Sequence, residues 1–537
     1  VNSGKILSVK TAQVLDLRGH DLRFRPDDGR MEVQSGQTQF GRNRDDWGNW
    51  FGCNNPNPGW HYVLADHYLK RNPHVRTPST KVMLGENNNS YPCGRVITHC
   101  FYDQPTPPAG EPGRWTCICG TMIYRDELLG KNFAGNLFVS DSVYNCIHRK
   151  IVTPDGVTFR GRRAAEERHS EFLVSADPWF RPNTIQTGPD GALWFADMVR
   201  LVIEHPEWLD VRLIDKLDVR AGHDKGRIYR VYPINSKPRP IRRLDSLDAV
   251  GLVAALDSPN GWQRDMAQQL LVWRQERAAI EPLRKMVTES PRALARLQAL
   301  CTLDGLDALS AELVVRALAD RHPGVRRHAI RLSERLLAQH DEVGEALLKL
   351  AQDTDAQVRM QLAYSLGEWD DPRGARALGR LAVQAAGEPY LTAAVLSSAS
   401  RNLPVLVNQI LPEARFAESR AGLIRQLFPL ALALDDESSL TLLLRSFTGQ
   451  GASNYGNWQY TLMASALDDL ARHKTSLPEL HQQAGPQLRE ALGQTPPLFA
   501  AARKVAADTA TATSDRVAAM VILGRGLAGR DEDLQTL

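Results

Sequence analysis

The chain has 537 residues, of which 43% are hydrophobic, and this length predicts more than one domain. Its 65 Lys and Arg residues nearly balance its 62 Asp and Glu residues, so the net charge of +3 offers no long-range field for nucleic acid or an anionic membrane. No run of about 18 apolar residues occurs, and the sequence therefore predicts no membrane span in this chain.

Six of the seven cysteines fall within the first 150 residues: Cys53, Cys93, Cys100, Cys117, Cys119 and Cys146. Clustered cysteines in a loop-rich region are compatible with up to about three disulfides, which would suit an extracytoplasmic protein. Buried thiols and a metal site are the alternatives, although the C-x-C pair at 117–119 lacks the second spaced pair of a zinc site. No C-x-x-C-H occurs, so the chain has no attachment motif for a c-type haem.

Short strands that follow turns dominate the first half of the chain. Residues 45–51, 131–141 and 188–197 each place aromatic residues just after a turn rich in Gly, Asn, Asp or Pro, and residues 225–231 supply another strand. Strand groups that recur in this way predict a β-propeller, with a twisted β-sandwich as the alternative. Only about three or four blades fit this length, so the propeller would be partial.

A linker is predicted at the change of composition near residue 240. Pro238 and Pro240 exclude both helix and ladder pairing, so residues 237–240 are expected to be extended within a linker of residues 236–247. We expect the β-rich region to occupy residues 1–235, with its last strand near 228–231, and an α-solenoid to occupy residues 248–537.

Beyond the linker, an Ala/Leu/Arg pattern recurs about every 32 residues, which predicts stacked helix pairs of the HEAT or armadillo type. A small or apolar residue four positions after each repeat start is expected to be buried: Ala267, Ala299, Ala329, Leu362 and Ala394. Four repeats also carry an arginine at the second position: Arg264, Arg296, Arg326 and Arg359. The near-neutral charge and the lack of interleaved aromatics favour a structural role for these arginines over nucleic-acid binding.

Several short ungapped motifs within residues 15–235 resemble, in the same order, motifs of the membrane-bound dehydrogenase family of planctomycetes and verrucomicrobia. These motifs lie at 35–42, 46–49, 147–149, 179–182, 188–193 and 202–208. The resemblance implies a six-bladed propeller similar to soluble quinoprotein glucose and sorbosone dehydrogenases, followed by HEAT repeats, in a periplasmic or otherwise extracytoplasmic protein. It also implies that this chain lacks the first blades and a terminal cytochrome c domain.

The same resemblance implies an oxidoreductase that acts on CH–OH groups of sugars or polyols and passes electrons to a cytochrome c. Such enzymes use pyrroloquinoline quinone, whose carboxylates are held by Arg and Lys, and calcium is a further candidate cofactor. Gln37 and Thr38 occupy the positions of an Arg-Asn pair in the family pattern, and neither offers a guanidinium group. Quinone binding is therefore expected to be weak, and the catalytic histidine is expected in the missing blades.

Five residues are candidates for binding a ligand in the channel of a propeller: Arg181, Arg125, Asp141, Asp197 and His99. Arg181 matches a family arginine and is the best candidate to hold an anion. The alternatives are a structural Arg-Asp pair for Arg125 and a hydrogen-bonded loop histidine for His99. His148 and Arg149, just before a strand and a Pro-Asp-Gly turn, are predicted to be structural and to face outward.

Two classes of function remain. In the first, the protein is an extracytoplasmic sugar or polyol dehydrogenase, and the solenoid docks an electron acceptor. In the second, the β-rich region binds carbohydrate or protein without catalysis, and the solenoid is an interaction scaffold.

Overall fold

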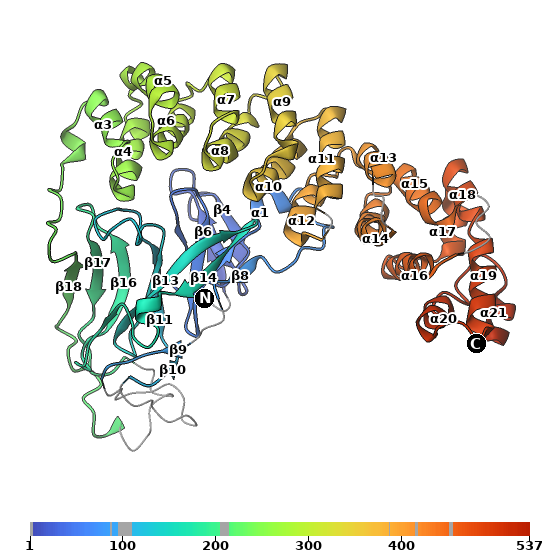
Figure 1. Ribbon diagram of the computed structural model, residues 1–537, viewed down its shortest axis with the longest axis horizontal. Coiled ribbons are helices and arrows are strands. Elements are labelled where there is room, and N and C mark those ends of the chain that lie inside the picture. Colours follow the sequence, from blue (N-terminus) through green and yellow to red (C-terminus); the bar gives the residue numbers. More distant parts are fainter. Residues whose placement is uncertain are drawn as a thin grey trace. The chain divides into compact units, whose positions relative to one another are not determined.

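The computed structural model describes residues 4–85, 89–94, 110–203, 214–385, 387–413, 417–449 and 455–537. Strands predominate as far as Val231, and α-helices predominate from Ala249 (Figure 1). The chain forms two compact units. Unit 1 consists of residues 1–66 and 79–329, and unit 2 of residues 67–78 and 330–537. The first helix pairs therefore belong with the sheets, and a short segment from the strand region belongs with the later helices.

Three antiparallel sheets of unit 1 follow one another in sequence. The first contains β5 (Asn43–Arg44), β6 (Trp50–Asn54), β7 (Asn57–Tyr62) and β8 (Lys81–Met83). The second contains β11 (Ile118–Ile123), β12 (Leu137–Asp141), β13 (Cys146–Asp155) and β14 (Thr158–Arg163), with β15 (Leu173–Val174) paired to β13. The third contains β16 (Pro182–Thr187), β17 (Leu193–Asp197) and β18 (Arg227–Val231). The remaining strands form two-stranded pairs: β1 (Lys5–Leu7) with β2 (Val14–Asp16), β3 (Asp21–Phe24) with β4 (Met31–Gln34), and β9 (Asn89–Ser90) with β10 (Gly113–Arg114).

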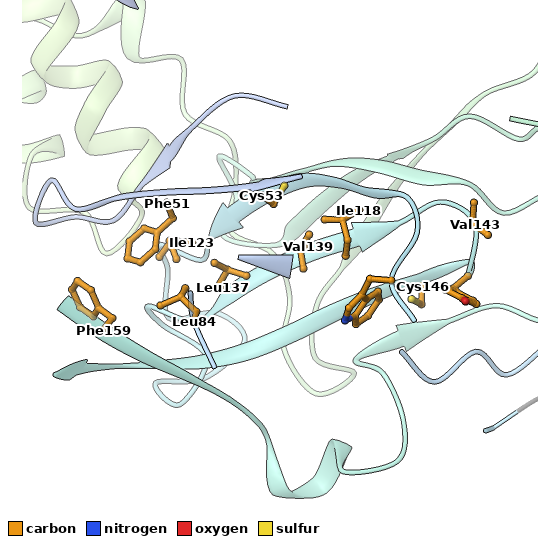
Figure 2. Packing of buried hydrophobic residues seen from close by; sticks show 12 residues of the cluster. Phe51, Cys53, Leu84, Ile118, Ile123, Leu137, Val139, Val143, Cys146 and Phe159 are labelled. Carbon is orange, nitrogen blue, oxygen red and sulfur yellow. The ribbon is translucent and has the colours of Figure 1, made fainter. Parts of the chain in front are cut away.

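The second sheet is covered on both faces. Successive side chains of a strand point to opposite faces, so one strand can contribute to the packing on both. Leu137 and Val139 of β12 pack into one apolar cluster with Phe51 of the first sheet (Figure 2). Phe138, between them, packs into another cluster with Phe195 of the third sheet. The three sheets are thus layered in chain order, and no closed ring of six blades is formed by the described residues.

The hairpin between β16 and β17 shows how turn chemistry sets the register of these sheets. Gly191 has φ +90°, a conformation that glycine adopts without strain. The Asp190 carboxylate accepts hydrogen bonds from the backbone N–H of Ala192 (3.1 Å) and from Nε1 of Trp194 (2.9 Å). The turn and strand that the sequence predicts within residues 188–197 are confirmed, and the Asp190 side chain holds the turn.

No disulfide links the described cysteines, and the structure favours the buried-thiol alternative for Cys53, Cys119 and Cys146. Burial raises the pKa of the Cys53 thiol to about 12 and raises that of Cys146 as well. Within the described part of the chain, no group of three or more His, Cys, Asp or Glu side chains is placed to hold a metal ion. Cys100 lies outside the described residues.

The helices of unit 1 are α3 (Ala249–Ala255), α4 (Gly261–Trp273), α5 (Ile280–Glu289), α6 (Ala293–Gly305), α7 (Ala311–Leu318) and the greater part of α8 (Pro323–Ser333). Unit 2 begins with the greater part of a short helix, α1 (Asp66–Leu69), and continues with α9 (Asp341–Leu348), α10 (Ala356–Ser365), α11 (Pro372–Gln384), α12 (Pro389–Ser397), α13 (Leu403–Glu413) and α14 (Ala417–Ala433). It ends with α15 (Glu437–Thr448), α16 (Asn457–Arg472), α17 (Leu477–Gln483), α18 (Pro486–Gly493), α19 (Pro496–Ala507), α20 (Thr513–Met520) and α21 (Arg530–Thr536). None of the described helices is long and apolar enough to cross a membrane.

The repeat positions behave as the period predicts. The five small or apolar residues at the predicted positions are fully buried: Ala267, Ala299, Ala329, Leu362 and Ala394. The repeat arginines each donate to the backbone carbonyl six residues earlier, at Ser258, Ser290, Asp320 and Asp353. Their structural role is confirmed, because each guanidinium satisfies a carbonyl in the turn that precedes its helix.

The predicted linker contains neither helix nor strand over residues 236–243, but its last part forms a 3-10 helix at Leu244–Ser246. It nevertheless runs along the β-rich region, since the backbone N–H of Arg239 donates to the carbonyl of Asp190 at 3.0 Å. The Arg239 guanidinium also pairs with the buried Asp126. The linker is extended but bound to the sheets.

Candidate functional site

Arg125, just after β11, lies in an ion network that joins the sheets to α4. Its guanidinium donates to both carboxylate oxygens of Asp265, at 2.7 and 3.0 Å, and to Asp46 at 2.6 Å. Arg264 also donates to Asp46, at 2.5 Å. Burial alone would raise the pKa of Asp265, but the hydrogen bonds and charge of Arg125 outweigh it and lower that pKa. The arrangement matches the structural Arg-Asp alternative and leaves Arg125 occupied.

The Asp-Trp-Gly-Asn turn at 46–49, one of the motifs that carry the family resemblance, packs against α8. The Trp47 ring stacks on His322 at 4.1 Å, and a Cβ on Gly324 would collide with the indole. Arg327 donates to the side-chain oxygen of Asn49 at 2.8 Å, and Nε2 of His328 lies 2.9 Å from the carbonyl of Trp47. In this unit the turn therefore anchors the first sheet to the helices.

Arg181 is 1% exposed and is surrounded by backbone carbonyls. Its three guanidinium nitrogens donate to the carbonyl oxygens of Ser142 (2.9 Å), Arg200 (2.9 Å) and Leu201 (2.6 Å). An anionic ligand would have to displace these bonds in a site closed to water. The geometry gives Arg181 the role of a buried brace between the second and third sheets.

The two candidate carboxylates also serve the backbone. Asp197 accepts the N–H groups of Arg181 (2.8 Å) and Val199 (2.9 Å), so Arg181 and Asp197 lie together. Asp141 is fully buried and accepts N–H groups of Val143 and Tyr144, at 2.8 and 2.9 Å. Burial raises the pKa of Asp141 in spite of these bonds. His99 lies outside the described residues.

The segment at Gln37-Thr38 is part of a half-buried cluster that the sequence analysis missed. The Thr38 N–H donates to the Asp21 carboxylate at 2.7 Å, and Arg42 donates to the same carboxylate at 2.8 Å. The Arg42 guanidinium also lies 3.7 Å from the centre of the Tyr62 ring. The Arg42 guanidinium thus lies beside Gln37 and Thr38, where the family pattern has an Arg-Asn pair, but it is paired with Asp21.

The prediction that His148 and Arg149 face outward is wrong, since each is 1% exposed. Both residues lie in the first half of β13, where the second sheet is covered on both faces. Nδ1 of His148 lies 2.6 Å from Glu171, and the other oxygen of this carboxylate accepts from Arg163 (3.0 Å) and from the N–H of Tyr91 (3.0 Å). Burial lowers the pKa of His148 although Glu171 opposes this. We call Glu171, His148 and Arg163 the buried triad.

Acidification is expected to destabilise unit 1 through His61, a buried histidine of β7. Burial lowers its pKa from 6.5 to about 3, so the unfolded chain binds the proton first and stability is lost as pH falls below 6.5. Between pH 7.5 and pH 5.0, wild type should lose about 2 kcal/mol more of its unfolding free energy than His61→Phe. Urea denaturation at several pH values measures this difference. Equal slopes would contradict it, and the exposed His20, changed to Phe, is the control.

A hollow of about 480 Å³ opens beside α4 and α6 in unit 1. One face of α4 contributes Asp265, Gln268, Gln269 and Trp273, whose spacing of three to four residues places them along one side of the helix. The other wall includes Cys301 and Asp304 of α6 together with Arg44 of β5: the hollow is lined by Arg44, Asp265, Met266, Gln268, Gln269, Val272, Trp273, Cys301, Asp304 and Gly305. Its size is in the range of sites for small molecules or short peptide segments.

In unit 2, the helices hold residues 67–78, a segment that comes from the strand region of the chain. The Tyr68 ring stacks on Tyr364 at 4.6 Å, and its hydroxyl donates to Glu334 at 2.6 Å. Arg71 donates to the Glu368 carboxylate at 2.7 Å and to Ser398 at 2.8 Å. The contacts continue from Asn72 to the carbonyl of Leu396 (3.0 Å) and from Arg76 to Asp469 (3.0 Å). The helix pairs of unit 2 thus bind a non-repeat segment through aromatic, arginine and amide anchors.

Two family models match the chain. Residues 1–235 match a domain of unknown function, DUF7133, and residues 310–399 match HEAT repeats. No curated protein matches the chain. The chain thus has a β-rich region that matches DUF7133 and a helical region that contains HEAT repeats.

Proposed function

We propose that this protein is an interaction scaffold, whose HEAT-type helix pairs bind extended segments of other proteins. The observation that carries the proposal is the segment 67–78, which unit 2 holds through side-chain anchors that any peptide of similar chemistry would offer. Repeat solenoids generally present such extended binding surfaces. The candidate ligand-binding arginines, Arg125 and Arg181, are occupied by internal partners, which also favours binding over catalysis.

The proposal is tested by supplying the bound segment as a separate molecule. Residues 67–78 are replaced by a Gly/Ser linker of equal length, and a synthetic peptide of these residues is titrated by fluorescence anisotropy. We expect saturable binding that weakens at least about tenfold in an Arg71→Ala peptide, because Arg71 reaches both Glu368 and Ser398. A Thr77→Ala peptide is the matched control, since Thr77 is exposed. A folded linker variant that binds no peptide would contradict the proposal.

We further propose that the three layered sheets are consecutive blades of a partial six-bladed propeller. The support is their order along the chain, their antiparallel pairing and the burial of the middle sheet between its neighbours. A twisted sandwich would instead pack two sheets face to face around one core.

The dehydrogenase function stays a prediction that rests on the sequence resemblance. It would place the protein outside the cytoplasm and give it pyrroloquinoline quinone, calcium and a cytochrome c partner. Titration with the quinone, with and without calcium, and an assay of aldose oxidation test it directly. Stoichiometric binding with turnover, both lost in Arg181→Ala while the fold is kept, would favour the dehydrogenase over the scaffold.

A further inference from the structure

The hollow beside α4 and α6 presents polar groups that its own protein does not use. The side chains of Gln268 and Gln269 are half-buried, and neither has a hydrogen-bond partner among the residues that the structure describes. A carboxamide offers a donor and an acceptor in one plane. That pairing matches the N–H and C=O groups of an extended peptide main chain.

Trp273, one turn of α4 beyond Gln269, supplies an apolar platform at the same hollow. Its side chain is 71% exposed, and tryptophan is one of the residue types enriched among binding hot spots. Asp265 of the lining is already paired with Arg44 (3.1 Å) and Arg125 (2.7 Å), so the attraction of the hollow for a cationic side chain comes from Asp304. Unit 2 contains such an arrangement within the chain itself, where Arg373 lies 4.9 Å from the Trp369 ring and pairs with Asp371 at 2.8 Å.

We propose that this hollow binds an extended segment of a partner protein that contains an arginine. Gln268 and Gln269 bind the main chain of that segment, and Trp273 stacks on its arginine. The carboxylate of Asp304 supplies the opposite charge. The proposal rests on the proposed scaffold function and assigns it a second site, in unit 1. Aromatic, arginine and amide groups also act together in unit 2, although there Arg71 and Asn72 belong to the bound segment 67–78.

The test selects ligands from a random dodecapeptide phage library on the intact protein and measures the selected peptides by calorimetry. We expect arginine-containing peptides whose affinity falls at least about tenfold in Trp273→Ala and in the double variant Gln268→Ala/Gln269→Ala. Asp304→Asn should weaken them less. Trp262→Ala is the matched control, because Trp262 is an exposed tryptophan of the same helix that does not line the hollow.

Three results would overturn the proposal: no selected peptide, peptides that bind Trp273→Ala as tightly as wild type, or peptides without a basic residue. A glycan array provides the competing outcome, since sugars also stack on exposed tryptophan. Glycan binding that is lost in Trp273→Ala would assign the hollow to carbohydrate instead. The titration of the 67–78 peptide on unit 2 reports separately on the scaffold function, so failure at one site is distinguishable from failure at both.

Discussion

Replacing Arg125 by methionine is expected to lower the free energy of unfolding of unit 1 by about 3–5 kcal/mol. The change removes a guanidinium that is 12% exposed, together with its hydrogen bonds to Asp46 and Asp265, and leaves Arg264 beside Asp46 and Arg44 beside Asp265. Methionine preserves much of the side-chain volume, so the cost comes from the lost charge-assisted hydrogen bonds. Urea denaturation and hydrogen–deuterium exchange of peptides that cover β11 and α4 measure the effect.

A surface pair provides the control for this prediction. Arg18 lies 2.8 Å from Asp16, but its side chain is 81% exposed. Arg18→Met should therefore change the unfolding free energy by no more than about 0.5 kcal/mol. If Arg125→Met were equally silent, the ion network would contribute nothing to stability, and Arg125 would again be a candidate for ligand binding.

The helical half could be predicted closely because its signal is local. The 32-residue period fixes which positions meet at helix crossings, and Ala267 and Ala299 are buried for that reason. The repeat arginines were also correctly interpreted, since a bond from Arg296 to the carbonyl of Ser290 needs only the turn before the helix. A local pattern of this kind needs no knowledge of distant residues.

The contacts between distant residues could not be predicted in this way. Trp47 meets His322, and Tyr68 meets Tyr364, across nearly 300 positions of sequence. No period or turn motif marks these partners, and composition placed the boundary at the prolines near residue 240. The compact units instead follow these long-range contacts, with α3 to α7 grouped with the sheets.

The candidate site residues show a related limit. Arg181, Asp141 and Asp197 were selected because polar residues at strand ends line the channel of a propeller. The same chemistry also satisfies buried backbone groups, and all three side chains are used in that way here. Strand ends attract polar residues for both reasons, and sequence alone does not separate them. The sequence did not point to Gln268 and Gln269 either, because only the structure shows whether a side-chain amide has a hydrogen-bond partner.

Replacing Glu171 by leucine should have an effect as large as the loss of Arg125. Glu171 is buried and accepts from Arg163 and from the N–H of Tyr91, while its second oxygen meets His148. Leucine removes every acceptor and leaves the Arg163 cation, which is 7% exposed, without this carboxylate. The expected loss of unfolding free energy is about 3–5 kcal/mol.

The variant Glu171→Gln separates charge from shape within the buried triad. Glutamine keeps one acceptor oxygen and nearly the same volume, so it should cost about 1–3 kcal/mol, less than leucine does. Pairing Glu171→Leu with His148→Leu removes one of the stranded polar groups, and the double variant should therefore cost less than the sum of the two single variants. Hydrogen–deuterium exchange of peptides from β13 and β14 measures all of these changes where they arise. Equal costs for glutamine and leucine would show that the charge of Glu171, which both variants lose, holds the second sheet in place and that the remaining acceptor oxygen contributes nothing.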